Sequence, residues 1–183
     1  MASFIFIRHG RTALSGKTDL LNKPTLEEQS DASMLETERG IAIRLRAMLI
    51  GQNLEPQYVL CSSWRHAHET ATLIAGESVP IVEVVALTPH TPDSEFSLEN
   101  LRETGAKAGI DWKSVRCVGV VGHEPRLSQL AAMITGVAVP RLARLSAGIL
   151  SGVSCEAMLE RVANTTREIV SVHGNSKTLK SRD

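Results

Sequence analysis

Short, continuous runs of apolar residues alternate along the chain with segments in which apolar residues recur at helical spacing. The apolar runs lie at 3–7, 57–61, 80–85 and 116–121. Their length and the polar or glycine-containing turns around them predict buried strands of a parallel sheet. The segments with helical spacing lie at 37–50, 64–74, 94–107 and 126–135, and Ser62 and Ser63 are candidate caps for the second of them. Strands that alternate with helices in this way predict an α/β fold.

The order of these elements is typical of a three-layer α/β/α sandwich with a mainly parallel central sheet. Residues 142–172 predict two or three further strands, partly antiparallel. Residues 13–34 lack periodicity and predict a long loop or lid, the kind of segment that often serves function. We therefore expect one domain over 1–172, followed by a polar, basic tail over 173–183 that frays.

Composition narrows the class of partner. The 183 residues include 20 Lys and Arg against 20 Asp and Glu, so the formal net charge is zero. A general nucleic-acid binder shows a basic excess, and only 3% of these residues are aromatic, which leaves little for base stacking. The apolar runs are far too short to span a bilayer. We expect neither a nucleic acid nor a membrane as partner.

The cysteines suggest a compartment and argue against one kind of metal site. The chain has an odd number of cysteines, and no two of them form a C-x-x-C pair; they are Cys61, Cys117 and Cys155. A disulfide framework or a thiolate zinc site is therefore not expected, and a reducing cytoplasm is the expected location. No H-x-x-x-H pattern with a carboxylate supports a histidine metal site either, so we expect no metal and no cofactor.

Basic residues and histidines gather in three loops, each directly after a predicted strand. These loops are 8–12 with Arg8 and His9, 61–66 with Arg65 and His66, and 122–125 with His123. Open α/β sheets bind ligands beyond the carboxyl ends of their strands, so these loops are expected to form one site. Arginine forks match phosphate oxygens, and a neutral imidazole can attack phosphorus. The pattern predicts a phosphate site whose chemistry needs no metal.

Two motifs in these loops resemble those of a known family. Phe-Ile-Arg8-His9-Gly10 resembles the signature of the histidine phosphatase superfamily, which includes phosphoglycerate mutases and acid phosphatases. Val-Val-Gly122-His123-Glu-Pro-x-Leu resembles the second-histidine motif of that superfamily. The Gly-His-x-Pro form and the Leu87-Thr88-Pro89 segment look most like the small SixA-type phosphohistidine phosphatases. The likeness runs from about residue 3 to about residue 155.

The resemblance implies a phosphoglycerate mutase-like fold and a specific mechanism. His9 would be the nucleophile that takes the phosphoryl group, Arg8 and His123 would bind the phosphate, and water would hydrolyse the phosphohistidine. The implied partner is a phosphorylated substrate. A phosphohistidine protein is the first choice, and a small phosphate ester, the substrate of a small-molecule phosphomonoesterase of the same superfamily, is the second. The alternative hypothesis outside the enzymes is a phosphate-binding or regulatory protein that has lost catalysis.

The sequence departs from the family at two places. The family pattern Ser-x-x-x-Arg-Ala-x-x-Thr-Ala, aligned on Thr70, puts His66 where the second arginine stands, with Arg65 one position earlier. Either Arg65 reaches the phosphate, or His66 serves as a weaker, pH-dependent cation. The second departure is the proton donor of the mutase-like members, for which this chain offers Asp93, Glu95 and Glu124 without a clean match.

Overall fold

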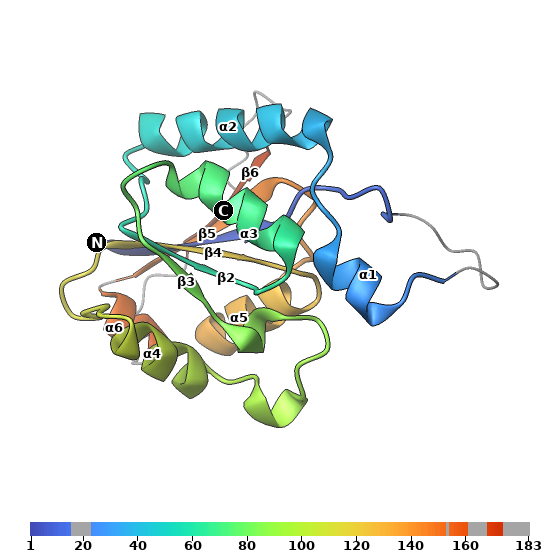
Figure 1. Cartoon of the computed structure of the whole chain (residues 1–183). Coiled ribbons are helices and arrows are strands. Elements are labelled where there is room, and N and C mark those ends of the chain that lie inside the picture. Colours follow the sequence, from blue (N-terminus) through green and yellow to red (C-terminus); the bar gives the residue numbers. More distant parts are fainter. Residues whose placement is uncertain (16–22, 153, 161–167, 174–183) are drawn as a thin grey trace.

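The computed structural model describes residues 1–15, 23–152, 154–160 and 168–173, which form one sheet covered by helices on both faces (Figure 1). The strands are β1 (Ala2–Arg8), β2 (Tyr58–Cys61), β3 (Ile81–Glu83), β4 (Cys117–Gly122), β5 (Ser146–Gly152) and β6 (Glu168–His173). Their order in the sheet is β3-β2-β4-β1-β5-β6. The pairings among β1 to β4 are parallel, and β5 pairs antiparallel with both β1 and β6. The predicted mainly parallel α/β sheet is confirmed.

Helices form the two outer layers. They are α1 (Leu26–Asp31), α2 (Glu36–Gly51), α3 (Arg65–Ala75), α4 (Leu98–Lys107), α5 (Arg126–Thr135) and α6 (Cys155–Leu159), with short 3₁₀ turns η1 (Val85–Leu87) and η2 (Asp93–Glu95). Figure 1 shows α2 and α3 on one face of the sheet and α4, α5 and α6 on the other. None of the described helices has the length and apolar character needed to cross a bilayer.

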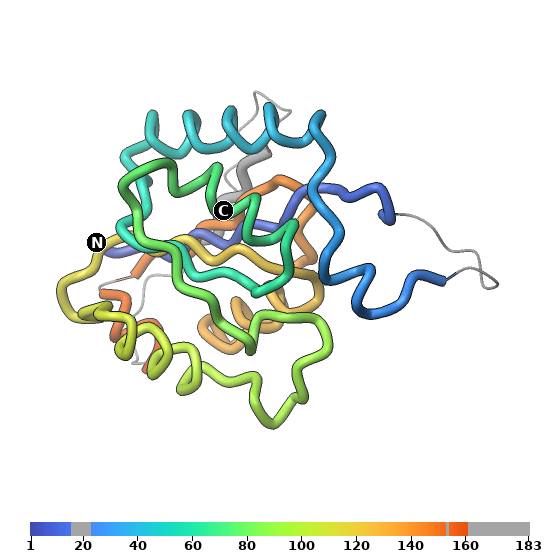
Figure 2. The backbone as a smooth tube through the Cα atoms, in the orientation of Figure 1, coloured from blue at the N-terminus to red at the C-terminus, as the bar shows by residue number. Residues whose placement is uncertain are grey.

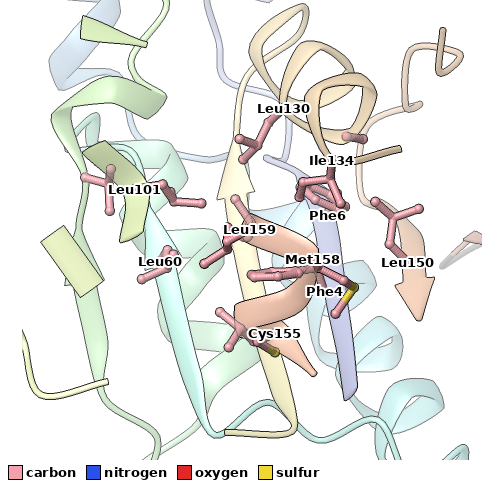
Figure 3. Packing of buried hydrophobic residues seen from close by; sticks show 14 of the residues in the cluster. Phe4, Phe6, Leu60, Leu101, Leu130, Ile134, Leu150, Cys155, Met158 and Leu159 are labelled. Atoms are coloured by element: carbon pink, nitrogen blue, oxygen red, sulfur yellow. The ribbon is translucent and has the colours of Figure 1, made fainter. Parts of the chain in front are cut away.

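The central strand β1 feeds a separate core on each face because its side chains alternate. Phe4 and Phe6 pack with residues of α5 and α6, as Figure 3 shows. Ile5 and Ile7 pack with residues of α2 and α3 on the opposite face. All four side chains are buried, and each such burial stabilises the fold by about 1.5–3 kcal/mol. This double burial fixes the end of β1, where Arg8 and His9 follow.

The three cysteines belong to this packing. Cys61, Cys117 and Cys155 are free thiols buried in the two cores. Burial raises the pKa of each thiol to about 12, so each stays protonated and unreactive near neutral pH. A catalytic role for any of them is not supported.

The prediction of a loop over 13–34 was incomplete, since α1 lies within that segment. Thr25 and Glu28 form a reciprocal capping box at the start of this helix. Six residues are too few to show a helical period, although the cap itself was readable in the sequence. Figure 2 shows the chain returning through α1 to α2, and Leu35 N–H donates to the carbonyl of Arg11 at 2.8 Å. Residues 16–22 lie outside the described part of the chain.

Two of the two or three strands predicted over 142–172 are present as β5 and β6, which pair antiparallel with each other. The short helix α6 before β6 was not predicted from the sequence pattern. Ser154 caps α6 by accepting a hydrogen bond from Ala157 N–H. The predicted third strand over 80–85 is shorter, because the chain turns into η1 after Val84. The tail predicted over 173–183 begins one residue too early, because His173 is the last residue of β6, and its remainder, 174–183, lies outside the described residues.

Candidate functional site

The parallel pairing of β1, β2 and β4 brings the three basic loops to one edge of the sheet. Arg8 lies opposite Gly122 in the β1–β4 register. His9 N–H donates to the carbonyl of Gly122 at 3.1 Å, and Ser62 N–H donates to that of Val121 at 3.1 Å. These bonds continue the sheet by one residue beyond the strands. The loops therefore meet where the sequence predicted one site.

Three histidines from these loops form a compact cluster. The ring centroids of His9 and His66 lie 4.3 Å apart, those of His9 and His123 4.5 Å, and those of His66 and His123 5.1 Å. All three side chains are buried. They line a pocket of about 200 Å³. Its other lining residues are Thr12, Leu14, Ser15, Gln29, Trp64 and Arg144.

The His9 ring is held by its own turn. Its Nδ1 lies 2.7 Å from the carbonyl oxygen of Gly10, which makes Nδ1 the donor and leaves the Nε2 lone pair free. Gly10 N–H donates to Thr70 Oγ1 at 3.2 Å. A Cβ at Gly10 would overlap Met34 Sδ, so a larger residue fits only if that side chain shifts. Close packing against Met34 and Glu38 thus favours glycine at this position of the motif.

His66 and His123 are also fixed by hydrogen bonds. Nδ1 of His66, in the first turn of α3, lies 3.0 Å from the carbonyl oxygen of Ala32. Nε2 of His123 lies 3.1 Å from Ser62 Oγ. The expectation that Ser62 caps α3 was wrong, since the N-cap is Trp64 and no side chain caps this helix. Ser62 instead accepts from Trp64 N–H at 3.3 Å and holds His123.

The cluster is uncharged at neutral pH. Burial, together with the other two histidines, lowers the pKa of His9 well below its usual value. Burial also lowers the pKa of His66, and that of His123 falls to about 3. The expectation that His66 acts as a pH-dependent cation therefore does not fit its buried position. The positive charge of the site must come from arginines.

Arg144 is a cation of the pocket that the sequence analysis missed. Its side chain lines the pocket and lowers the pKa values of His9 and His123. Its Nη1 is buried and makes no hydrogen bond to the residues that the structure describes. An unpaired buried guanidinium nitrogen is costly, and an anion in the pocket would satisfy it. Because β5 runs antiparallel to β1, the segment just before β5 reaches the same edge as the end of β1.

Arg8 is hydrogen-bonded to the segment before β5 that also carries Arg144. Its Nη1 donates to the carbonyl of Leu142 at 3.0 Å, and its own carbonyl accepts from Leu145 N–H at 3.0 Å. Its Nε is buried without a partner among the described residues. The charge of Arg8 contributes to the lowered pKa of His123 and is itself attracted by Glu124. Arg8 is not one of the described residues that line the pocket, and it acts on the cluster through its charge.

Arg65 points away from the pocket. Its Nε lies 3.3 Å from Glu69 Oε1, its Nη1 lies 3.5 Å from Asp31 Oδ1, and its side chain is about half exposed. The alternative in which Arg65 reaches the phosphate is thus not supported by its geometry. Of the two residues that could take the place of the second arginine, His66 is the one that lines the pocket. Arg11 also faces outward and pairs with Glu38 at 2.8 Å.

The three candidate proton donors lie elsewhere. Asp93 pairs with Arg126 at 2.7 Å, and Glu95 is exposed in η2. Glu124 accepts from Leu142 N–H at 2.7 Å and from the Ser128 hydroxyl at 2.7 Å. None of the three lines the histidine pocket in the described residues. Glu124 instead anchors the segment that carries Arg144.

Trp64 forms one wall of the cluster. Its ring meets His123 edge-on at a centroid distance of 4.9 Å and His66 at 5.8 Å. His90 lies 5.8 Å from the same indole. The indole keeps water from one side of the imidazoles, which fits their lowered pKa values. Trp112, by contrast, is a core residue.

No protein-family model matches the sequence, and no curated protein matches it either. Solved structures do match in fold. A protein histidine phosphatase SixA complexed with tungstate shares 17% identity over 94% of this chain and 97% of its own, with a TM-score of 0.64. The alpha-ribazole phosphatase from Shigella flexneri shares 15% identity over 99% of this chain and 100% of its own, with a TM-score of 0.62.

A third structural match is a mycobacterial glucosyl-3-phosphoglycerate phosphatase in complex with VO3. It shares 18% identity over 83% of this chain and 92% of its own, with a TM-score of 0.57. At these identities the likeness concerns the fold alone. The chain therefore has the fold of the histidine phosphatases, over nearly its whole length and nearly the whole length of these structures.

Proposed function

We propose that this protein is a phosphatase that works through a phosphohistidine on His9. The observation that carries the proposal is the state of that ring. Its Nδ1 is committed to the Gly10 carbonyl, its burial keeps it neutral, and it shares a pocket with a guanidinium nitrogen that lacks a partner among the described residues. A fixed, neutral imidazole beside a cation is suited to attack a phosphoryl group. The structural matches to named phosphatases lend the proposal support.

In the first step, Nε2 of His9 attacks phosphorus. A P–N bond forms as the bond from phosphorus to the leaving group breaks. Arg144 and Arg8 offset the charge on the transferring oxygens, the task that fixed donors perform in most phosphoryl transfers. With the Ser62 hydroxyl donating to Nε2 of His123, Nδ1 of that ring carries a proton and can donate to a phosphoryl oxygen.

In the second step, water attacks the phosphorus of the phosphohistidine. The P–N bond breaks, inorganic phosphate leaves and His9 returns to its neutral form. Every residue given a role here belongs to the chain. The chemistry assigned to these side chains involves proton and phosphoryl transfer only.

We propose a phosphohistidine protein as the preferred substrate class. The pocket lining in the described residues includes no carboxylate, so a strong general acid is lacking there. Imidazole is a better leaving group than an alkoxide, and it asks less of a general acid. A small phosphate ester is the second choice within the same mechanism.

The test uses two substrates and a trapped intermediate. Wild-type protein should dephosphorylate a phosphohistidine peptide faster than glycerol 3-phosphate, whose leaving group is an alkoxide, and acid-labile label should appear on His9 after a brief reaction with labelled substrate. His9→Asn should show neither turnover nor label, whereas His68→Ala, on the exposed side of the same helix as His66, should resemble wild type. Binding of vanadate by wild type without turnover would instead support a phosphate-binding protein that has lost catalysis.

A further inference from the structure

We propose that His9, His66 and His123 bind a zinc-class divalent metal ion. Each ring offers one nitrogen, and these three atoms all lie within 4.8 Å of one another. The rings come from three separate segments of the chain, and they face one pocket. Three histidine ligands with an open fourth position make a common zinc arrangement in proteins. A small inward movement of these side chains would bring the nitrogens to ligand distances.

The hydrogen bonds around the cluster match those of metal-binding histidines. Such a ligand usually donates its second ring N–H to a backbone carbonyl or a carboxylate, which fixes the tautomer and the ring orientation. His9 and His66 both place Nδ1 at a carbonyl oxygen, that of Gly10 and that of Ala32. Nε2 is then the lone-pair atom of both rings. Ser62 can accept from Nε2 of His123, which leaves Nδ1 of that ring as the third ligand.

The charge state of the rings also suits a metal. A histidine must be neutral to bind, and the burial of all three rings disfavours their charged form. Soft thiolates are absent from the described lining, and imidazoles are well matched to zinc, copper and nickel.

The positive charges of two arginines near the cluster would repel a divalent cation with no anion bound to it. They therefore indicate that an anion is the fourth ligand of the metal. Arg144 lines the pocket, and its Nη1 has no hydrogen-bond partner among the described residues. Arg8, directly before His9 in the chain, places a second positive charge near His123. An anion on the metal, such as hydroxide or chloride, would reduce the net charge and would accept a hydrogen bond from Arg144. The proposed ligand is thus a divalent cation together with a small anion.

His66 is the residue that makes the cluster possible. An arginine at this position, as in the pattern that the sequence resembles, would place a fixed cation where the third nitrogen now lies. The metal would also hold Nε2 of His9, the atom proposed to attack phosphorus. Metal binding and phosphohistidine formation would then exclude each other, so the metal would act as an inhibitor. The binding itself does not depend on the proposed phosphatase activity.

The test is a titration of metal-free protein with Co²⁺, followed by Zn²⁺. Wild type should bind one Co²⁺ per chain with the visible absorption bands of tetrahedral cobalt, and Zn²⁺ should remove these bands. Trp64 touches two of the rings, so its fluorescence should fall as Co²⁺ binds. Trp64→Phe should lose this fluorescence change and keep the absorption bands.

Variants decide whether the bands come from this cluster. His66→Arg and His66→Gln should lose the tetrahedral bands, with folding checked by circular dichroism, whereas His68→Ala should keep them. Zn²⁺ should slow any phosphatase turnover of wild type and leave that of His66→Arg unchanged. Wild type without tetrahedral bands, or folded His66 variants that bind as wild type does, would overturn the proposal. A catalytically inactive wild type that still shows the bands would overturn the proposed function alone.

Discussion

The ring of His66 lies 4.3 Å from the ring of His9, at the position where the related sequence pattern has an arginine. The substitution replaces a long, always charged side chain with a short, neutral one. The cation that the pattern would supply from α3 is instead available from Arg144, just before β5. The pocket thus keeps a positive charge but receives it from a different part of the chain.

The first prediction concerns the nucleophile. His9→Asn should lower phosphatase turnover by a factor on the order of 10⁴ or more, because loss of a nucleophile removes the covalent route entirely. Steady-state kinetics with a phosphohistidine peptide measure this loss. The unfolding midpoint should change little, which separates loss of chemistry from loss of fold. Turnover close to that of wild type would contradict the role of His9.

The second prediction compares two arginines. Arg144→Ala should lower kcat/KM by roughly 10²- to 10³-fold, the range for removal of one charge-stabilising donor. Arg65→Ala should change it by less than about 3-fold, because the Arg65 side chain is half exposed and pairs with acidic residues. Equal losses in the two variants would show that both arginines reach the substrate.

The third prediction concerns the glycine beside His9. Gly10→Ala should destabilise the fold by about 1–3 kcal/mol, because the added Cβ would overlap Met34 Sδ. Urea unfolding measures this change. Gly51→Ala is the matched control, since a Cβ there meets nothing within 4 Å, and it should leave stability equal or slightly higher. A neutral Gly10→Ala would show that Met34 moves aside freely.

The fourth prediction is a pH dependence of the stability of the metal-free protein. The pKa values of His9, His66 and His123 are lowered in the fold, and that of His123 falls to about 3. Below the unfolded pKa of about 6.5, the unfolded chain therefore binds more protons than the folded one, and stability falls as pH falls. Each such histidine contributes a slope of up to roughly 1.4 kcal/mol per pH unit.

Urea unfolding between about pH 7.5 and about pH 5 measures this slope. His123→Gln should give a shallower decline than wild type, because it removes one group that the unfolded chain protonates. Gly51→Ala, which removes no titratable group, should decline in parallel with wild type. Parallel curves for wild type and His123→Gln would mean that the buried histidine does not resist protonation.

Much of the site was predictable because its parts are local. Each of the apolar runs that form β1, β2 and β4 is followed at once by its polar loop, and parallel strands must bring such loops together. The sequence alone therefore places His9, His66 and His123 at one edge of the sheet. The choice between Arg65 and His66 could not be made in this way. Adjacent helix residues point about 100° apart, and only the packing of α3 against the loop at Ala32 shows which one faces inward.

The amino-acid sequence alone determines the α/β class, the succession of strands and helices, and the candidacy of His9 and His123, because apolar runs and the residues that end them are read over a few positions. It leaves His66 as an alternative to Arg65. The folded chain was needed to show that Arg144 joins the histidines and that the imidazoles are neutral. It was also needed to place Arg65, Asp93, Glu95 and Glu124 outside the pocket. Arg144 reaches the site through the antiparallel pairing of β5 with β1, a contact between residues far apart in the chain. The neutral state arises from burial, which depends on everything packed around the rings.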